Sequence, residues 1–325
     1  MNVLISSAGR RGALVKILRE SVAKRGGKVF AIDASDWSAA CRLADDWKQV
    51  PRCGDPAFIS TVLDHCQRND IRLVIPTIDP ELPVYARQRD LFRQHGISIA
   101  VSSPETIKIS SDKLATDRFL AATGLPGVVR VDPAKAATYP LIVKPRFGSA
   151  SSGVQIVQDR EELDFFVKRT SKPIVQQLAS GDEYTVNFYV DLNQQCRVAV
   201  PHRRVETRGG EVSKCVTEMV PELVEIAHEL AKKLPGAWGP MCYQAFVSEQ
   251  NETRIIEINP RFGGGYPIAH QAGADFAELL LRETLGNPLP TAELAWQVGL
   301  AMTRWDEAVF MDRRESHAVK PREVA

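Results

Sequence analysis

The sequence predicts an α/β domain with a parallel sheet, followed by a larger α+β region built around an antiparallel sheet. Over the first hundred residues, short apolar runs alternate with stretches of helical spacing, which is typical of βαβ units. From Glu183 onward, alternating strands follow one another with turn signals between them, which is typical of an antiparallel sheet. A chain of 325 residues is long enough for about two domains, or for three small lobes.

The first hundred residues are predicted to form parallel strands separated by helices. The strands are expected at Val3–Ile5, Val29–Ile32, Leu73–Ile75 and Ile97–Val101, and the helices at Ala13–Arg25, Phe58–Arg68 and Leu82–Gln94. Ligands of such sheets bind at the carboxyl ends of the strands. Those ends carry the segment Ser6–Gly12, Asp33, and the segment Thr77–Glu81.

A domain boundary is expected near residue 103, so that residues 1–103 form the first domain and residues 104–305 the second. Pro104 begins a short helix, and Asp112 caps a helix over Lys113–Thr123. A small lobe is expected over about residues 126–178. Its predicted elements are the strand Pro140–Lys144, a turn of small residues over Arg146–Gly153, the strand Val154–Val157, the helix Asp159–Arg169 and the strand Ile174–Leu178.

An antiparallel lobe is expected over about residues 182–290. The predicted strands are Tyr184–Val190, Cys196–Val205, Glu211–Met219, Met241–Ser248 and Thr253–Ile258, and the predicted helices are Glu222–Leu234 and Asp275–Leu285. A triple glycine, Gly263–Gly265, forms a loop after the last of these strands. The charged tail, residues 306–325, is predicted to be poorly ordered.

A lysine stands at the end of a small-lobe strand, just before the turn of small residues. Lys144 and the turn Arg146–Gly153 can place one cation and several backbone N–H groups around phosphates. The phosphate-binding P-loop motif, in which the lysine follows the glycines, is absent. A surface hairpin with a solvated lysine explains the segment equally well, so this segment by itself leaves both interpretations open.

Polar side chains alternate along the strand that precedes the triple glycine. Glu257 and Asn259 are two residues apart, so both side chains leave the same face of the strand. A carboxylate beside an amide oxygen suits Mg²⁺, and Arg261 is placed to reach phosphates bound there. Ile256 and Ile258 are expected to point the opposite way, into a core. The alternative is the polar outer face of an edge strand.

Two further segments are weaker signals. Gln244, on the preceding strand, is placed to add one more oxygen, although an ordinary cross-strand polar pair is the better explanation for it alone. The strand end Gln176-Gln177-Leu178 can pair an adenine edge with its backbone groups, and Glu183 can accept hydrogen bonds from ribose hydroxyls. By itself, that second segment is better explained as a turn with an exposed acid.

Together, in order and in character, these segments resemble the ATP-grasp superfamily, in particular the carbamoyl phosphate synthase large-subunit type. The resemblance extends from the first strand to about Gly286 and is strongest at Lys144–Gly153, Gln176–Glu183 and Glu257–Gly265. It implies a Rossmann-like pre-ATP-grasp domain followed by a two-lobed ATP-grasp domain. It also implies ATP as cofactor with a pair of Mg²⁺ ions, for which Mn²⁺ can substitute.

The resemblance implies a role for each matching residue. Implied contacts to the triphosphate come from Lys113, Lys144 and the turn that includes Gly148, Ser149, Ser152 and Gly153. The implied adenine hinge is Gln176, Gln177 and Leu178, the ribose-binding acid is Glu183, and the magnesium ligands are Gln244, Glu257 and Asn259. Arg261 and Lys144 are the implied catalytic residues. Two departures stand out: the hinge usually carries a glutamate where this chain has two glutamines, and the chain has a single ATP-grasp unit, so a full carbamoyl phosphate synthase is not expected.

The implied reaction is activation of a carboxylate by ATP, which gives an acyl phosphate and ADP, followed by attack of an amine. An alternative of the same class is activation of bicarbonate or carbamate. An alternative of another class is a nucleotide-binding module without turnover, although the intact set Glu257, Asn259 and Arg261 argues against it. A dinucleotide-binding dehydrogenase ranks last, because Gly9 and Gly12 complete only part of the glycine fingerprint that would pair with Asp33.

The substrates are expected to be a small carboxylic acid or amino acid and an amine. Three polar clusters are expected to face one cleft: Arg10 and Arg11; Thr77, Asp79 and Glu81; and Arg203, Arg204, Arg208 and Lys214. Arginines suit a carboxylate, and acids suit an amine. A solvated edge explains the arginines of the third cluster about as well. A homodimer is expected by analogy with relatives.

Charge and cysteine content set the expected partners and compartment. The formal net charge is +1, so binding to nucleic acid through the bulk field is not expected. No apolar run is long enough to cross a membrane, and the N-terminus is interpreted as a first strand, not a signal peptide. The six cysteines are scattered without a CxxC pair, which indicates reduced thiols in a cytoplasmic protein.

Overall fold

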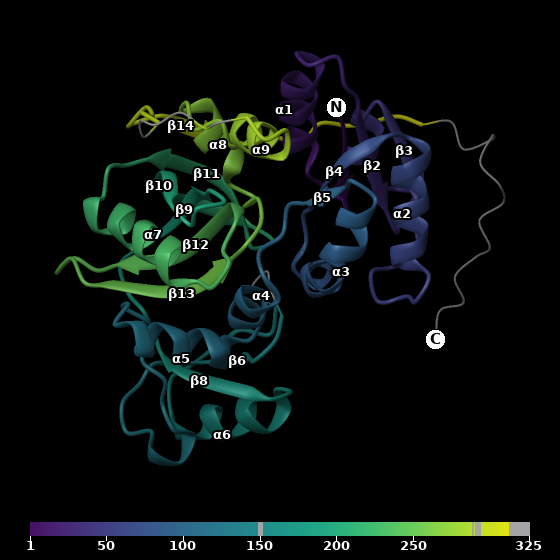
Figure 1. The fold of residues 1–325 in the computed structure, drawn as a ribbon. Coiled ribbons are helices and arrows are strands. Elements are labelled where there is room, and N and C mark those ends of the chain that lie inside the picture. The colour runs from purple at the N-terminus through teal and green to yellow at the C-terminus, as the bar shows by residue number, and fades with distance from the viewer. Residues whose placement is uncertain (149–151, 288, 290–293, 312–325) are drawn as a thin grey trace.

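The computed structural model describes residues 1–148, 152–287, 289 and 294–311. Figure 1 shows the N-terminal domain beside a large antiparallel sheet, with a small lobe below that sheet. The predicted mixed architecture is confirmed: a parallel α/β domain comes first and an ATP-grasp-like two-lobed region follows. Within the described residues, no helix is both long and apolar enough to cross a membrane.

The N-terminal domain is a parallel sheet in the order β3-β2-β1-β4-β5. Its elements are β1 (Asn2–Ser6), α1 (Gly12–Ala23), β2 (Val29–Asp33), β3 (Asp46–Gln49), α2 (Phe58–Arg68), β4 (Ile71–Pro76), α3 (Leu82–Gln94) and β5 (Ser98–Ile99), with 3₁₀ turns at Ala40–Leu43 and Asp79–Glu81. Helix α1 covers one face and α2 and α3 cover the other, so the inner strands are apolar on both faces. The edge strand β3 was not predicted, because its residues are polar and partly exposed.

Strands β1 and β4 are neighbours at the point where the strand order reverses. Their carboxyl ends are tied together, since Thr77 Oγ1 donates to the carbonyl oxygens of Ser6 at 3.0 Å and Ser7 at 2.7 Å. Such a switch point is where open α/β sheets bind ligands. The segments after β1 and β4 therefore reach the same edge of the domain, as the strand pattern predicts.

Two capped helices connect the domains. Helix α4 (Pro104–Ser111) begins after Ser103, whose hydroxyl accepts from the N–H of Thr106, and α5 (Lys113–Thr123) begins after Asp112. Helix α5 ends at Gly124, which has a φ of +71°. The small lobe follows, with a sheet in the order β7-β6-β8. Its elements are β6 (Leu141–Pro145), β7 (Gln155–Val157), α6 (Arg160–Arg169) and β8 (Pro173–Gln177), with a 3₁₀ turn at Pro133–Lys135.

The large sheet has the order β13-β12-β9-β10-β11-β14, with antiparallel neighbours. Its elements are β9 (Asp182–Val190), β10 (Cys196–Arg208), β11 (Glu211–Thr217), α7 (Pro221–Lys233), β12 (Gly239–Val247), β13 (Thr253–Asn259), α8 (Tyr266–Gln271), α9 (Phe276–Thr284) and β14 (Ala301–Thr303). Helix α8 and the edge strand β14 were not predicted. They are six and three residues long, too short for a clear hydrophobic period.

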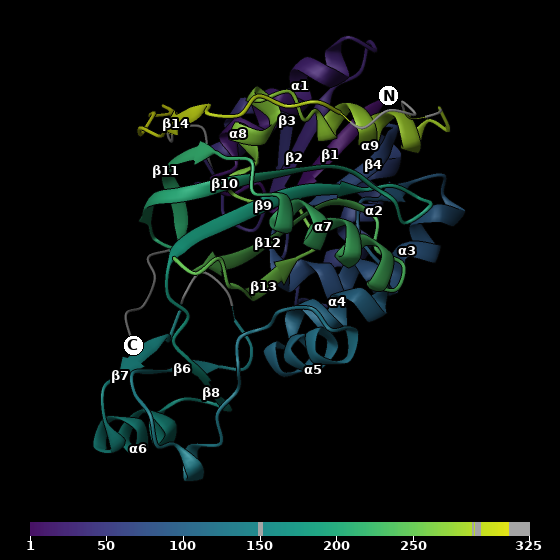
Figure 2. The same cartoon turned by 90° about the vertical axis from the view of Figure 1, so that its left-hand side faces the viewer.

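The central part of the large sheet is packed on both faces. Helix α7 packs on one face around Phe188 and Tyr243. The other face packs on α8, α9 and the N-terminal domain through one continuous apolar core that includes Val3, Tyr189 and Phe276. Figure 2 shows α8 and α9 between this face and α1. Because the core is shared, the N-terminal domain and the large sheet hold the residues between them in place.

Candidate functional site

Three neighbouring cavities meet at Glu257. The inter-lobe cavity, about 220 Å³, lies between the small lobe and β12–β13, and the inter-domain cavity, about 230 Å³, lies between the N-terminal domain and the large sheet. A third cavity of about 300 Å³ lies beside α4 and the segment after β4. Glu257 lines all three, and Gln244 lines the first two.

The inter-lobe cavity gathers most residues that the sequence assigned to ATP. Those in its lining are Lys113, Lys144, Gly148, Ser152, Gln176, Gln177 and Glu183. Leu178 and Gly153 are next to lining residues but are not in the lining themselves. Ser149 lies outside the described residues. The fold therefore brings residues from α5, β6, β8 and β9 together around the inter-lobe cavity.

Two lysines, the buried Lys144 and the partly buried Lys113, give this cavity its positive charge. Lys144 is only 8% exposed, and burial lowers the pKa of its ammonium group, with the charge of Lys113 adding to the effect. Burial also lowers the pKa of Lys113, whose Nζ donates to the carbonyl oxygen of Gly148 at 2.7 Å. Desolvated cations attract an anion strongly, so this cavity suits a polyphosphate.

Gln176 is fixed by a carboxylate at the back of the same cavity. Its Nε2 donates to Oδ1 of Asp117 at 2.9 Å and to Oδ2 at 3.1 Å. Burial raises the pKa of Asp117, while the charge of Lys144 and the hydrogen bond from Gln176 oppose that rise. Asp117 lies on α5, and nothing in its sequence context indicated that it belongs to the site.

The predicted metal ligands are brought together on adjacent strands. Gln244 on β12 pairs directly with Glu257 on β13, and Asn259 Nδ2 donates to Glu257 Oε1 at 2.9 Å. One carboxylate with two nearby amide oxygens is a set that suits Mg²⁺, which keeps water and phosphate as its remaining ligands. No group of three or more His, Cys, Asp and Glu side chains arranged for a metal exists among the described residues. The set fits a nucleotide-bound Mg²⁺ better than a metal held by protein alone.

A β-bulge corrects one prediction about this strand. The pairing of β12 with β13 slips between Gln244 and Ala245, so Ile256 is an extra residue opposite Gln244. Ile258 is buried in the core as predicted, but Ile256 is only half-buried and lines the inter-lobe cavity beside Glu257. The prediction that Ile256 points into the core is therefore wrong, because the bulge interrupts the alternation of the strand.

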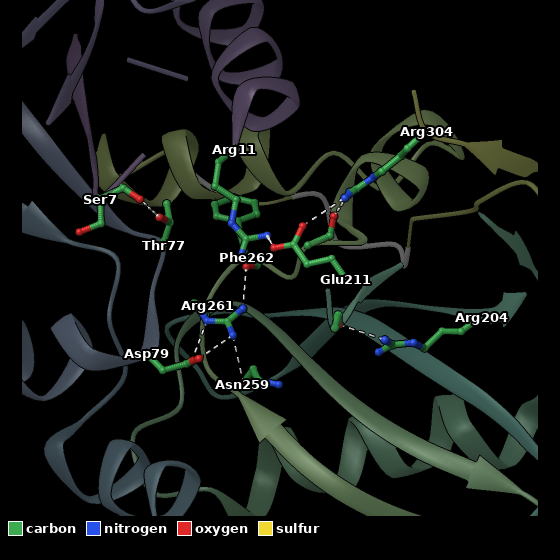
Figure 3. Close-up of polar contacts among 12 residues, drawn as sticks. Ser7, Arg11, Thr77, Asp79, Arg204, Glu211, Asn259, Arg261, Phe262 and Arg304 are labelled. Carbon is green, nitrogen blue, oxygen red and sulfur yellow. Dashed lines mark hydrogen bonds and ion pairs between the residues drawn. The ribbon is translucent and has the colours of Figure 1, made fainter. Parts of the chain in front are cut away.

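Arg261 joins the two domains. Its Nε and Nη2 donate to Oδ1 and Oδ2 of Asp79 at 2.7 and 2.8 Å, and its Nη2 also contacts Asn259 Oδ1 at 3.3 Å (Figure 3). Burial alone would lower the pKa of Arg261, but the charge and hydrogen bonds of Asp79 outweigh it and leave the pKa raised. The segment after β4 thereby holds the arginine that the sequence assigned to phosphates.

Three arginines, Arg11, Arg204 and Arg261, line the inter-domain cavity, and Arg304 contacts two other residues of its lining, Glu211 and Gly264. Glu211 on β11 lies between Arg11 and Arg304, with an N–O distance of 3.3 Å to each, and Arg304 also donates to the carbonyl oxygen of Gly264 (Figure 3). Burial lowers the pKa of Arg11, and the charge of Glu211 opposes this. Arg204, whose side chain is 6% exposed, contacts Oε1 of Glu183 at 3.3 Å. Arg204 lines the inter-domain cavity and Glu183 lines the inter-lobe cavity, so this ion pair connects the two.

The expectation that all three polar clusters face one cleft holds for part of them. Arg11, Thr77, Asp79 and Arg204 line the inter-domain cavity. Five of the predicted substrate residues are outside its lining: Arg10, Glu81, Arg203, Arg208 and Lys214. Glu211 and Arg304 were missed. Glu211 was predicted only as the first residue of a strand, and β14 and the residue after it carry no pattern that separates them from a surface segment.

Each of those five side chains has another position. Arg10 is exposed, and Glu81 is fully buried, where it accepts hydrogen bonds from Ser6 and Ser7. The other three form ion pairs at the surface: Arg203 with Glu218, Arg208 with Asp306, and Lys214 with Glu206. Adjacent residues of a strand point to opposite faces, so Arg204 reaches the cavity and Arg203 does not.

The triple glycine packs closely on buried polar side chains. A Cβ at Gly265 would lie 2.5 Å from Nε2 of His202, and one at Gly263 would lie 2.8 Å from Oδ1 of Asn187. His202 is fully buried, and burial lowers its pKa to about 3, so the ring is neutral. The absence of side chains lets this loop approach β9 and β10 and form one wall of the inter-domain cavity.

Comparison with known proteins matches both halves of the chain. A family model described as an ATP-grasp domain matches residues 110–265, and one described as a PylC-like N-terminal domain matches residues 3–100. Phosphoribosylamine–glycine ligase of Methanocella arvoryzae is 24% identical over 298 residues, covering 80% of this chain and 67% of the relative. 3-methyl-D-ornithine–L-lysine ligase of Methanosarcina mazei is 24% identical over 273 residues, covering 81% and 67%.

A solved structure shows the same fold. The N5-carboxyaminoimidazole synthetase of Staphylococcus aureus complexed with ADP superposes with a TM-score of 0.73 at 19% identity, covering 91% of this chain and 79% of that one. The chain thus spans about two thirds of the length of both curated relatives. The chain therefore contains an ATP-grasp domain with a PylC-like N-terminal domain in front of it, and the relatives that it matches are ATP-grasp ligases.

Proposed function

We propose that this protein is a Mg-ATP-dependent carboxylate–amine ligase that acts through an acyl phosphate and releases ADP and phosphate. The observation that carries the proposal is the meeting of two cavities at Glu257. One cavity is lined by Lys113 and the buried Lys144, and the other is lined by Arg11, Arg204 and other charged side chains. A terminal phosphate in the first cavity would face a carboxylate in the second.

In this proposal the lysines offset the charge of two reacting anions. A carboxylate oxygen attacks the γ-phosphorus of ATP, and ADP leaves with the electrons of the broken P–O bond. Lys144 and Lys113 hold the phosphates, while Arg261, held by Asp79, faces the negative charge of the incoming carboxylate. An amine then attacks the acyl carbon, and phosphate leaves.

Glu257, Asn259 and Gln244 are the residues that would hold magnesium. When bound, Mg²⁺ neutralises charge on the phosphate oxygens and aligns them for in-line attack. To receive the ion, the Asn259 amide must turn its oxygen, rather than its Nδ2, toward the side of Glu257. The small lobe supplies Ser152 and Gly148 to cover the phosphates and keep water away from the acyl phosphate.

The acid substrate is proposed to be an amino acid or another small carboxylic acid. Each curated relative's name pairs an amino acid with an amine-bearing partner. The inter-domain cavity of about 230 Å³ is lined by arginines that suit a carboxylate, and by the acids Asp79 and Glu211, which suit an amine. This volume is far larger than bicarbonate needs, so an organic acid is preferred over bicarbonate as the activated substrate.

A cytoplasmic location and a homodimer are also proposed. All six cysteines are free thiols, and five of them are buried, which supports a reducing, cytoplasmic compartment. A homodimer is proposed by analogy only.

The test is release of ADP and phosphate from Mg-ATP, with mass detection of products. The substrate panel holds amino acids singly and in pairs, small acids, bicarbonate and ammonia, with Mn²⁺ as a substitute metal. Glu257→Ala should lower turnover by about a hundredfold or more, because it removes the carboxylate that would hold the metal. Glu252→Ala is the matched control, since Glu252 is an exposed carboxylate that pairs with Arg254 near the turn of the same hairpin.

Three outcomes would contradict the proposal in different ways. Full turnover by Glu257→Ala would remove Glu257 from the reaction. ADP release with bicarbonate as the sole acid would establish the bicarbonate alternative. Binding of nucleotide with no turnover across the panel would indicate a module that binds nucleotide without catalysis.

A further inference from the structure

The amide of Gln176 is held in one orientation by a carboxylate behind it. Gln176 is 3% exposed on β8, and its Nε2 contacts both oxygens of Asp117, at 2.9 and 3.1 Å. An ionised carboxylate only accepts hydrogen bonds, so it selects the NH₂ end of the amide. The reversed amide would place the oxygen of Gln176 against the oxygens of Asp117, acceptor against acceptor.

This orientation leaves the amide oxygen as the end that a ligand can meet. Gln176 Oε1 has no hydrogen-bond partner among the described residues, and it is not one of the fully buried polar atoms that lack a partner. Gln176 lines the inter-lobe cavity together with Lys144 and Gln177. An amide oxygen held at a cavity wall in this way presents a hydrogen-bond acceptor with a fixed direction.

An acceptor in this position distinguishes nucleotide bases by their exocyclic group. The 6-amino group of adenine donates hydrogen bonds, whereas the 6-oxo group of guanine or hypoxanthine accepts them. Facing Gln176 Oε1, a 6-oxo group loses the hydrogen bond and also leaves two acceptors opposed. A site built to bond a donor rejects analogues that lack it, because its own buried group is then unpaired.

We propose that Asp117 is a positioning residue that fixes Gln176 as a hydrogen-bond acceptor, so that the site selects 6-aminopurine nucleotides over 6-oxopurine nucleotides. The inference rests on the proposed nucleotide site in the inter-lobe cavity. It also accounts for the glutamine at the hinge: Asp117 carries the negative charge, and Gln176 presents the neutral acceptor. Asp117 would not itself touch the nucleotide.

The experiment compares binding of ADP and IDP, which differ in the group at position 6 of the purine and, with it, in the proton at N1, and neither of which can transfer a γ-phosphate. Calorimetry with Mg²⁺ measures both dissociation constants for the unmodified chain and for Asp117→Asn. The unmodified chain should bind ADP about tenfold or more tightly than IDP, the scale of one lost hydrogen bond plus one unpaired acceptor. In Asp117→Asn the ratio should fall to about threefold or less, because an asparagine can pair with either end of the Gln176 amide.

A double variant separates orientation from general damage. In Asp117→Asn/Gln176→Glu, the new carboxylate offers acceptors at both ends, so preference for ADP should return although Asp117 is absent. A purely structural role for Asp117 would weaken ADP and IDP binding equally and would not be rescued. Retention of the native ratio in Asp117→Asn, or equal binding of ADP and IDP by the unmodified chain, would overturn the inference. Failure of the unmodified chain to bind either nucleotide would instead refute the proposed function beneath it.

Discussion

Asp79→Asn tests how strongly the N-terminal domain is fastened to the ATP-grasp domain. Arg261 is 11% exposed, and Asp79 is 26% exposed, so the substitution leaves a largely buried cation without its counter-charge. Removing one partner of a buried pair typically costs about 3–5 kcal/mol. Asparagine keeps one acceptor, and Arg261 keeps its bonds to Phe262 O and Asn259. We therefore expect the free energy of unfolding to fall by about 2–3 kcal/mol.

The matched control is Asp306→Asn. Asp306 also meets an arginine through two hydrogen bonds, at 2.5 and 3.0 Å, but it is 80% exposed and its partner Arg208 is 67% exposed. Water and salt replace such a pair, so this substitution should leave stability unchanged. Urea unfolding followed by tryptophan fluorescence measures both variants. Equal stability of Asp79→Asn and the unmodified chain, or equal losses in the two variants, would refute the argument that burial makes the Asp79–Arg261 pair important.

Three further predictions concern single residues. Gly265→Ala should lower both the melting temperature and turnover, since its Cβ would lie 2.5 Å from His202, whereas Gly54→Ala meets nothing within 4 Å and should be silent in both assays. Burial lowers the pKa of Lys144, so ADP binding should weaken as the pH rises through that lowered pKa and the ammonium group becomes neutral. Lys144→Arg should still bind ADP at alkaline pH, because the guanidinium stays charged. A calorimetric pH series in which the unmodified chain and Lys144→Arg lose ADP binding equally at alkaline pH would contradict this. Glu81→Gln should lower the free energy of unfolding by about 2 kcal/mol. The buried carboxylate accepts hydrogen bonds from two hydroxyls and two backbone N–H groups, and glutamine would replace one of its acceptor oxygens with an NH₂ donor. An unchanged melting temperature would contradict this prediction.

The spacing of apolar residues along the sequence predicted those helices and strands whose buried residues recur at a regular interval. Helix α2 was predicted with the bounds that the structure shows, because its buried residues recur at helical spacing. Gln244 and Glu257 were predicted as neighbours, because a hairpin with a short turn sets the register of its strands. Strands β3 and β14 were missed, since short, polar edge strands show no such period.

Contacts between residues far apart in the sequence could not be predicted from the spacing of apolar residues. Asp79 and Arg261 are 182 residues apart, and their meeting depends on how the two domains share a core. The sequence indicated that Asp79 and Arg261 were both polar residues at strand ends, but not that one would hold the other. The same holds for Asp117 and Gln176, which are 59 residues apart and come from different elements.

The bulge at Ile256 shows why a site interrupts the pattern that predicts it. Ile255 is two residues before Glu257, so a regular strand would place both side chains on the face toward the cavities. Ile255 is instead buried in the core, with 1% of its surface exposed. The extra residue lets Ile255 and Ile258 both stay in the core while Ile256 and Glu257 both face the inter-lobe cavity. An apolar side chain then lines the inter-lobe cavity next to the carboxylate at the point where the cavities meet. The irregularity that made the prediction for Ile256 fail is therefore part of what shapes the proposed site.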